Sequence, residues 1–243
     1  KHINLEEKLL VYPAYEEFMD GPFLNVDQGM NVSKSRIQRE TSMVVGIREY
    51  RPGDRFSWID WKASAKRNGM VTKEFEQSQS RDVFITMDCA PDHRFETTVS
   101  FTASLGQALL RKGIQVGCLS VDNERVSMPI YGGEVNRQQL FYQLAQAKDN
   151  CPVSFDQVLG TESLLLQQKA MLMLVTAHLS TPLIEITSRF TTRNYPVVIF
   201  VIKAAGDSVT LTEQSMKERA KMRGIRVAFI HEGQFSNWAF GGE

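Results

Sequence analysis

The sequence predicts an α/β fold, a doubly wound, mostly parallel sheet with a small β-rich subdomain at its N-terminus. From residue 82 onward, short strands that are apolar throughout alternate with helices, which is typical of a parallel sheet covered on both faces. Before residue 82, short strands of alternating polarity are separated by turn residues and a polar stretch. We therefore assign residues 1–81 to the β-rich subdomain and residues 82–243 to the α/β domain.

The α/β domain begins with an apolar strand at 83–88 and a helix at about 93–112. The remaining elements are expected in this order: strand 115–121, hairpin strand 126–130, helix 138–147, strand 171–175, a helix opened by Thr181–Pro182, strand 197–202, a helix after Thr210, and strand 225–230. Glu213, three residues after Thr210, predicts a capping box. Right-handed crossovers between these strands give the doubly wound sheet.

In the first 81 residues we expect strands at 5–12, 41–50 and 70–76 and a long loop over 16–38. The turn that follows the second strand reads Arg51-Pro52-Gly53-Asp54. A short helix carrying Trp58 and Trp61 comes next, capped by Asp54 or Ser57. We expect left-handed backbone conformations at Gly53, in the turn, and at Gly69, where this helix ends.

An ordered series of charged, aromatic and turn residues runs through residues 46–75, which we call the signature block. Its members are Arg48, Glu49, Tyr50, Pro52, Gly53, Asp54, Ile59, Trp61, Lys62, Ser64, Ala65, Glu74 and Phe75. The series resembles the bacterial domain-of-unknown-function 58 family. Lys66 stands where that family usually has arginine, which keeps the charge but loses the planar fork that binds a carboxylate or phosphate in two places.

Two interpretations of the signature block are open. In one, side chains of both signs form an internal clasp of ion pairs and caps, namely Arg48, Glu49, Asp54, Asp60, Lys62 and Glu74. In the other, Trp58 and the basic residues form a docking surface, because tryptophan and arginine often dominate the energy of protein interfaces. The candidate site, structural or docking, comprises Arg48, Glu49, Tyr50, Pro52, Gly53, Asp54, Trp58, Asp60, Trp61, Lys62, Lys66 and Glu74. A catalytic role is not supported, because no nucleophile is paired with one of the four scattered histidines.

The family resemblance implies a non-enzymatic protein-interaction module, the soluble part of a membrane-anchored bacterial protein. Relatives usually carry two membrane-spanning helices ahead of this part, so we expect such helices before Lys1 and this domain on the cytoplasmic side of the cell membrane. The implied partner is a MoxR-type ATPase of the AAA class. Residues 34–81 hold 11 basic and 6 acidic residues, a surplus that suits an acidic partner or anionic lipids, and we expect no nucleic acid.

The order of elements in residues 82–243 also resembles the von Willebrand factor A fold, which often holds a divalent metal ion at the carboxyl edge of its sheet. In that fold the first strand ends in Asp-x-Ser-x-Ser, and a later strand ends near another aspartate. Here the first motif reads Asp88-Cys89-Ala90-Pro91-Asp92, and the later strand is followed by Ala177. We therefore expect no metal and no other cofactor, with Asp88 and Asp92 as a turn residue and a helix cap. The alternative is a metal-dependent hydrolase that uses magnesium, Asp88 and Asp92.

Overall fold

The computed structural model describes residues 10–17, 44–54, 56–67, 69–75, 82–161 and 170–235. These residues belong to two compact units. The α/β unit contains residues 10–17 and 82–235, and the small unit contains residues 44–75. The predicted fold class is confirmed, because the α/β unit is built on a six-stranded, mostly parallel sheet and the small unit on a two-stranded antiparallel sheet.

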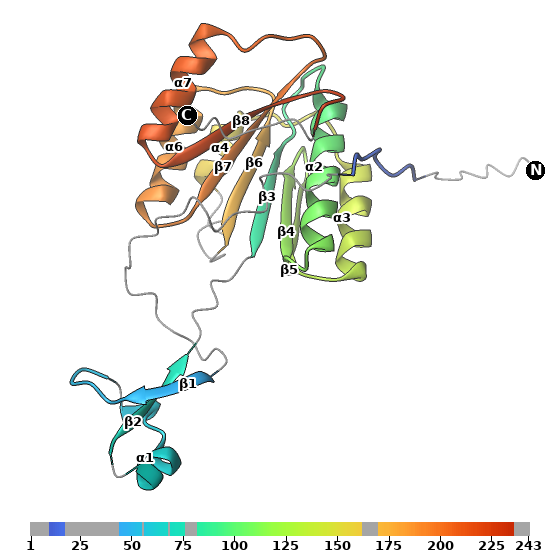
Figure 1. Cartoon of the computed structure of the whole chain (residues 1–243). Helices are drawn as coiled ribbons and strands as arrows, with labels where there is room; N and C mark the ends of the chain where they lie inside the picture. The colour runs from blue at the N-terminus through green and yellow to red at the C-terminus, as the bar shows by residue number, and fades with distance from the viewer. Residues whose placement is uncertain are drawn as a thin grey trace, which may run out of the picture. The chain divides into compact units, whose positions relative to one another are not determined.

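The large sheet has the strand order β5-β4-β3-β6-β7-β8 (Figure 1). Its strands are β3 (Val83–Asp88), β4 (Val116–Val121), β5 (Arg125–Tyr131), β6 (Met171–Thr176), β7 (Val197–Lys203) and β8 (Ile225–His231). Only β4 and β5 are antiparallel neighbours within it. Strands β3, β6 and β7 are buried along their whole length, as their continuous apolar runs predicted.

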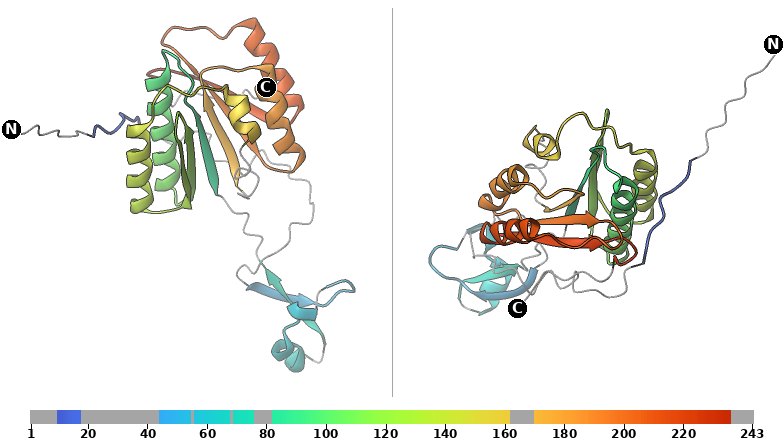
Figure 2. Two further views of the ribbon diagram at one scale, coloured as in Figure 1. Left: turned by 180° about the vertical axis from the view of Figure 1, so that it is seen from behind. Right: turned by 90° about the horizontal axis from the view of Figure 1, so that it is seen from above.

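Helices cover both faces of this sheet (Figure 2). They are α2 (Phe95–Arg111), α3 (Glu134–Gln146), α4 (Phe155–Thr161), α6 (Thr181–Thr192) and α7 (Leu211–Met222). Helix α2 packs with α3, whereas α6 packs with α4 and α7. The core beneath α6 joins Leu174 of β6 and Ile199 of β7 to Ile184. Burial of this apolar surface is the main stabilising contribution to the unit.

The direction in which the sheet grows reverses between β3 and β6. After β3 the chain adds β4 on one side, and after β6 it adds β7 on the other. In open α/β sheets, the carboxyl ends of the strands at such a reversal form the usual ligand crevice. The ends of β3 and β6, at Asp88 and Thr176, are therefore the first place in this unit to look for a site.

Most of the elements predicted for this unit are confirmed to within a few residues. The capping box is also confirmed, since the Thr210 hydroxyl accepts a hydrogen bond from the Glu213 amide at 3.2 Å and the Glu213 carboxylate accepts one from the Thr210 amide at 2.9 Å. Helix α3 begins at Glu134, earlier than predicted. Helix α4 was not predicted, because its seven residues include Gly160 and are too short to give a helical period.

The N-terminal segment differs from the prediction. Of the strand expected at 5–12, residues 1–9 lie outside the described part, and Leu10–Tyr12 belong to no strand. Instead, residues 10–17 lie along α2 and α3. The rings of Tyr12 and Tyr15 meet Phe141 edge to face, at 6.3 and 5.3 Å between centroids. Residues 10–17 therefore pack with the α/β unit, although our division of the chain placed them in the β-rich subdomain.

The small unit pairs β1 (Val44–Glu49) with β2 (Val71–Phe75). Between them lie a short 3₁₀ helix at Phe56–Trp58 and helix α1 (Trp61–Arg67). Ile59 forms a bridge to Thr72 of β2, and both residues are buried. The predicted helix is therefore wrong at its start, because Trp58 and Ile59 precede α1 rather than belong to it.

The two glycine predictions have different outcomes. Gly53 has a φ of 103°, as a turn with glycine at its third position requires. Gly69 is not in the left-handed region, so the predicted glycine cap of α1 is wrong. The Ser64 hydroxyl instead accepts a hydrogen bond from the Val71 amide at 3.0 Å, which fixes the passage from α1 into β2.

Candidate functional site

Asp54 is the centre of the hydrogen bonds in the signature block. Its carboxylate accepts two hydrogen bonds of 2.8 Å from the Arg48 guanidinium, one to each oxygen. It also accepts the Arg51 amide at 2.9 Å and the Thr72 hydroxyl at 3.5 Å. These contacts join the turn to both strands of the small unit, and the Arg48 hydrogen bonds hold the pKa of Asp54 well below its usual range.

This arrangement realises one pair of the predicted clasp. The prediction grouped Arg48 with Glu49, Asp54, Asp60, Lys62 and Glu74, and of these the structure pairs Arg48 with Asp54, six residues away. The Lys62 side chain is exposed, and the Glu74 side chain lies outside the described part. Arg48 retains 32% of its side-chain exposure, so solvent screens the pair and the 3 kcal/mol scale of a buried ion pair does not apply to it.

Asp60 is the N-cap of α1. Its carboxylate accepts the Ala63 amide at 3.0 Å, and its carbonyl oxygen accepts the amide and the hydroxyl of Ser64 at 2.8 and 2.7 Å. The prediction that Asp54 or Ser57 caps the helix is therefore wrong. No residue of α1 is buried, so the hydrogen bonds that Asp60 accepts and those that Ser64 makes, rather than apolar packing, hold the helix in place.

Asp60→Ala should lower the free energy of unfolding of the small unit by about 1 kcal/mol, the usual cost of losing an N-cap side chain. Asp60→Asn should restore most of the loss, because asparagine is an equally good cap. Urea melts followed by tryptophan fluorescence would measure both. A loss from Asp60→Ala of about 3 kcal/mol or more would contradict the cap role and favour the ion pair that the sequence suggested.

The side of α1 that faces away from the strands is basic and aromatic. Trp61 is 65% exposed, and Lys62, Ala65 and Lys66 are also exposed, at positions that lie side by side on a helix, whereas Ala63 and Ser64 are half-buried. We call Trp61, Lys62, Ala65 and Lys66 the α1 outer face. The ring of Phe56, which is 70% exposed, stacks on that of Tyr50 with 6.2 Å between the ring centroids.

The prediction made Trp58 the outward-facing tryptophan of the docking surface. In the structure Trp58 is half-buried, and Trp61 is the more exposed of the two. Of the other candidate residues, Glu49 and Pro52 are exposed and Tyr50 is half-buried. The signature block therefore divides into an internal part around Asp54 and an exposed part on α1.

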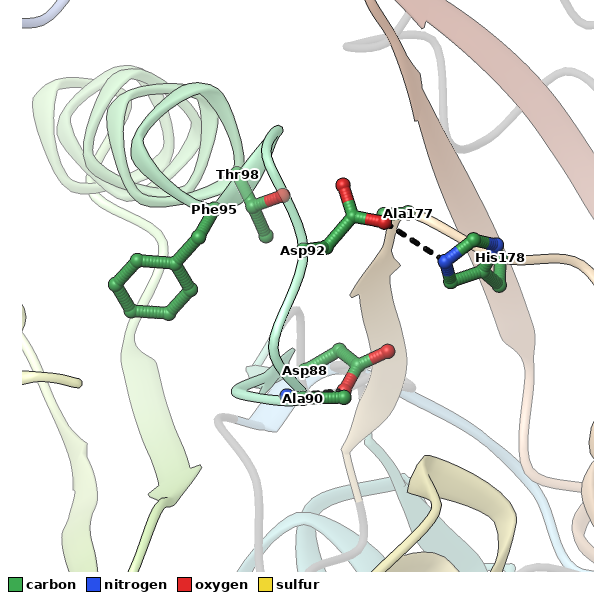
Figure 3. Close-up of a pocket in the computed structure, with 7 residues that line it drawn as sticks. All are labelled: Asp88, Ala90, Asp92, Phe95, Thr98, Ala177 and His178. Atoms are coloured by element: carbon green, nitrogen blue, oxygen red, sulfur yellow. Dashed lines mark hydrogen bonds and ion pairs between the residues drawn. The ribbon is translucent and has the colours of Figure 1, made fainter. Parts of the chain in front are cut away.

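A second cluster lies at the carboxyl edge of the large sheet, where the growth of the sheet reverses (Figure 3). Asp88 ends β3, and its carboxylate accepts the Thr176 hydroxyl of β6 at 2.6 Å and the Ala90 amide at 3.0 Å. Asp88 is therefore a turn residue, as predicted. Its carboxyl group is almost buried, and burial raises its pKa above the ordinary value of 3.8.

Asp92 is held by Arg94. The guanidinium donates hydrogen bonds of 2.8 Å from Nε and from one terminal nitrogen, one to each carboxylate oxygen. The other terminal nitrogen donates to the carbonyl oxygen of Ile202, at the end of β7, at 3.2 Å. On its outer side, Asp92 meets the His178 ring at 2.8 Å. Asp92 also accepts the Arg94 amide, but helix α2 begins at Phe95 and its N-cap is Arg94. The predicted role of Asp92 as the helix cap is therefore wrong, and Asp92 is instead an ion-pair partner of Arg94.

These residues do not fit a divalent cation. One small hollow is lined by Asp88, Ala90, Asp92, Phe95, Thr98, Ala177 and His178. The two alanines carry no side-chain oxygen that could serve as a ligand, and the Thr98 hydroxyl already donates a hydrogen bond to the Arg94 carbonyl oxygen at 3.0 Å. Both oxygens of Asp92 already bind Arg94. Among the described residues, no group of three or more histidine, cysteine, aspartate or glutamate side chains is arranged to hold a metal ion. A hydrolytic mechanism through magnesium therefore finds no ligand set here.

Asp88→Asn should raise the free energy of unfolding at neutral pH. A folded-state pKa above the unfolded value means that the folded protein binds the proton more tightly, so this carboxyl group lowers stability as the pH rises through 3.8 and above. Asparagine removes that cost, and the Thr176 hydroxyl keeps a second acceptor, the His178 carbonyl oxygen at 3.3 Å. Urea melts at pH 4 and pH 7 test this, and a variant less stable than the parent at both values would contradict it.

Sequence reasoning did not select three residues that build this cluster, Arg94, Thr176 and His178. The Asp92-His93-Arg94 spacing was a local signal for the ion pair, since the guanidinium and the carboxylate are two residues apart. No feature of the neighbouring sequence indicates a role for His178. It comes close to Asp92 only because β6, which precedes it, lies beside β3 in the sheet. A further ion pair joins Lys203, which is buried at the end of the neighbouring strand β7, to the half-buried Glu213 at 2.9 Å.

Within the described residues, no helix is long and apolar enough to cross a membrane.

Comparison with known proteins gives two findings. Residues 46–217, most of the chain, match the family model described as "Protein of unknown function DUF58". The chain is also 31% identical over 238 residues to "Uncharacterized protein YeaD" of Bacillus subtilis (strain 168), covering 96% of this chain and 58% of that protein. The chain thus spans little more than half the length of this relative. On the family match and this identity, the chain belongs to the DUF58 family.

Proposed function

We propose that this chain is a non-enzymatic protein-interaction module, part of a membrane-anchored bacterial protein, and that it docks on a MoxR-type AAA ATPase through the α1 outer face. The observation that carries the proposal is the exposure of Trp61 on a helix that buries none of its residues. A tryptophan at 65% exposure contributes nothing to the core, whereas a partner could bury its ring. The ATPase as partner and the membrane anchor rest on the family resemblance.

The charge of α1 favours an acidic partner surface. The helix carries Lys62, Lys66 and Arg67, all exposed, and no acidic residue. The carboxylate that immediately precedes the helix, Asp60, is directed into it as its cap. An acidic patch on the partner would therefore meet little repulsion, and its attraction would increase the rate of association.

Binding of a purified MoxR-type ATPase from the same organism to the immobilised chain tests the proposal. We expect a saturable complex whose affinity falls as salt rises, because the contact involves several exposed cations. The same preparation should show no hydrolysis of ester or phosphoester substrates with added magnesium. Absence of binding at every salt concentration would contradict the proposal, as would metal-dependent hydrolysis that Asp92→Ala abolishes.

The hydrolase alternative has no support from a specific contact. Asp88 and Asp92, the two carboxylates that it requires, already bind Thr176 and Arg94. Because each carboxylate is already hydrogen-bonded to a protein group, neither is free to act as a general base on a nucleophile.

A further inference from the structure

Helix α3 uses amide side chains on its inner side. Two of its five buried residues are amides, Asn136 and Gln143. Asn136 donates hydrogen bonds of 2.8 and 2.7 Å to backbone carbonyl oxygens of β4 and β5. Gln143 donates to the Ser120 hydroxyl at 2.9 Å and to a carbonyl oxygen of β5 at 3.0 Å. These hydrogen bonds fix which side of α3 faces the sheet.

The opposite side of α3 is apolar and uncharged where a surface helix usually carries charges. Its exposed residues recur at spacings of three and four, so they lie in one row along the helix. Val135 is 78% exposed and Tyr142 is 50% exposed. We call this row the α3 outer face, and its members are Val135, Gln138, Gln139, Tyr142 and Gln146.

Charge is nearly absent from the whole edge of the sheet to which α3 belongs. Residues 126–147, which contain all of α3 and most of the edge strand β5, include only two charged residues, Glu134 and Arg137. These two neutralise each other, because Arg137 Nε donates to both carboxylate oxygens of Glu134 at 2.9 Å. Tyr131 at the end of β5 and Tyr12, which packs on α3, are exposed as well. Figure 1 shows α3 and β5 together at this end of the unit.

We propose that the α3 outer face is the surface through which two copies of this chain associate, with the two α3 helices antiparallel across a two-fold axis. In such a dimer the same surface is used twice, so a charge at its centre would oppose its own copy. This face carries no charge, and the cores of protein interfaces are likewise poor in charged residues and rich in tyrosine. A face without cations also gives no attraction to anionic lipids or to an acidic partner.

The spacing along α3 defines the contacts of this dimer. Val135 and Tyr142 are seven residues apart, so in an antiparallel pair each Val135 faces Tyr142 of the second copy. Gln138 and Gln139 then lie at the axis, where glutamine side chains can both donate and accept hydrogen bonds. A further strand on β5 is a less suitable contact, because Pro129 has no amide hydrogen to donate. The inference goes beyond the proposed docking function and does not depend on it, because the α1 outer face belongs to the small unit.

Analytical ultracentrifugation of the full chain over a wide concentration range tests the proposal. We expect a reversible equilibrium between monomer and dimer, and Tyr142→Arg should raise its dissociation constant at least about tenfold. Met222→Arg is the matched control, because Met222 is 82% exposed on α7, and it should dissociate like the parent. Neither substitution should change the melting temperature of dilute protein, since both side chains are at least half exposed.

A second experiment tests the two-fold axis. One variant carries Gln138→Lys with Gln139→Lys, and the other carries Gln138→Glu with Gln139→Glu. Each variant alone should be monomeric, because its added charges oppose those of its copy. An equal mixture of the two should form a mixed dimer that weakens as salt rises.

Four results would overturn the proposal. The first is a parent that stays monomeric at every concentration. The second is a dimer that Tyr142→Arg weakens no more than Met222→Arg does. The third is a mixture of the lysine and glutamate variants that gives no mixed dimer. The fourth is a monomeric parent that binds phosphatidylcholine vesicles unless it carries Tyr142→Arg, which would assign the α3 outer face to a lipid surface instead.

Discussion

Asp92→Ala should lower the free energy of unfolding of the α/β unit by about 3 kcal/mol, because it leaves the Arg94 guanidinium nearly buried without its carboxylate partner. Both side chains of this pair are 9% exposed, so solvent cannot replace the lost hydrogen bonds. Urea melts at neutral pH measure the difference. Glu134→Ala is the matched control, since it removes a carboxylate paired with Arg137 on the surface of α3, where little change is expected.

The same variant should show a defined pH dependence. The Arg94 hydrogen bonds hold the pKa of Asp92 well below its ordinary value of 3.8. The stability that Asp92 contributes is therefore fully present above pH 3.8 and is lost as the pH falls toward the lowered pKa. The gap between parent and Asp92→Ala should accordingly be constant from neutral pH to about pH 5 and narrow below pH 4. A gap that widens on acidification would contradict the ion pair.

Gly117→Val should also cost about 3 kcal/mol, because β4 has no room for a side chain at this position. Gly117 lies opposite Phe84 in the parallel register of β3 and β4. A Cβ atom there would lie 2.6 Å from a ring carbon of Phe84 and 2.8 Å from Ile130. Phe84 is itself 2% exposed within the core, so its ring cannot move away without opening that core.

Gly160→Ala is the control for Gly117→Val, and the free energy of unfolding of both variants is measured by urea melts. A Cβ atom at Gly160 would meet only the Ile186 side chain, at an ordinary 3.6 Å, and alanine favours the helical backbone of α4. We expect unchanged or slightly higher stability. If Gly117→Val melts like the parent, the register of β3 and β4 at Phe84 is not as described.

The sheet could be predicted from the sequence because strands that are buried on both faces are continuous runs of apolar residues. The run Val197–Lys203 is apolar up to its last residue, and the whole strand is buried. The hairpin at Asp122 was predictable for a different reason: its carboxylate accepts the Glu124 amide at 2.6 Å, a contact between near neighbours in the chain. Local chemistry and the period of the apolar residues together define most of the α/β unit.

The small unit could be predicted less well, because α1 has no buried face. The side of the helix on which a tryptophan lies is normally inferred from the spacing of buried residues, and none of the seven residues of α1 is buried. Ile59 is buried, whereas Trp61, two residues later, is exposed. The cap role of Asp60 was missed because Asp54 and Ser57 were equally suitable by residue type.

The cluster around Arg94 depends on contacts that the sequence does not mark. The Asp92 pair is local, but the hydrogen bond from Arg94 to the Ile202 carbonyl oxygen spans 108 residues, and His178 reaches the same group from a third segment. Comparison with an expected metal motif led us to Asp88 and Asp92 and to the two alanines. It did not indicate that a guanidinium binds Asp92, because no position in such a motif is assigned to a cationic side chain.

The most direct test of the central claim is the dissociation constant of the ATPase complex for Trp61→Ala, measured beside thermal melts of the same preparations. Leu211→Ala is the control, because Leu211 is 84% exposed on the α/β unit, away from α1 in the chain. We predict that Trp61→Ala weakens binding at least about tenfold with an unchanged melting temperature, and that the control changes neither quantity. Equal affinities for Trp61→Ala and the parent would contradict docking through the α1 outer face.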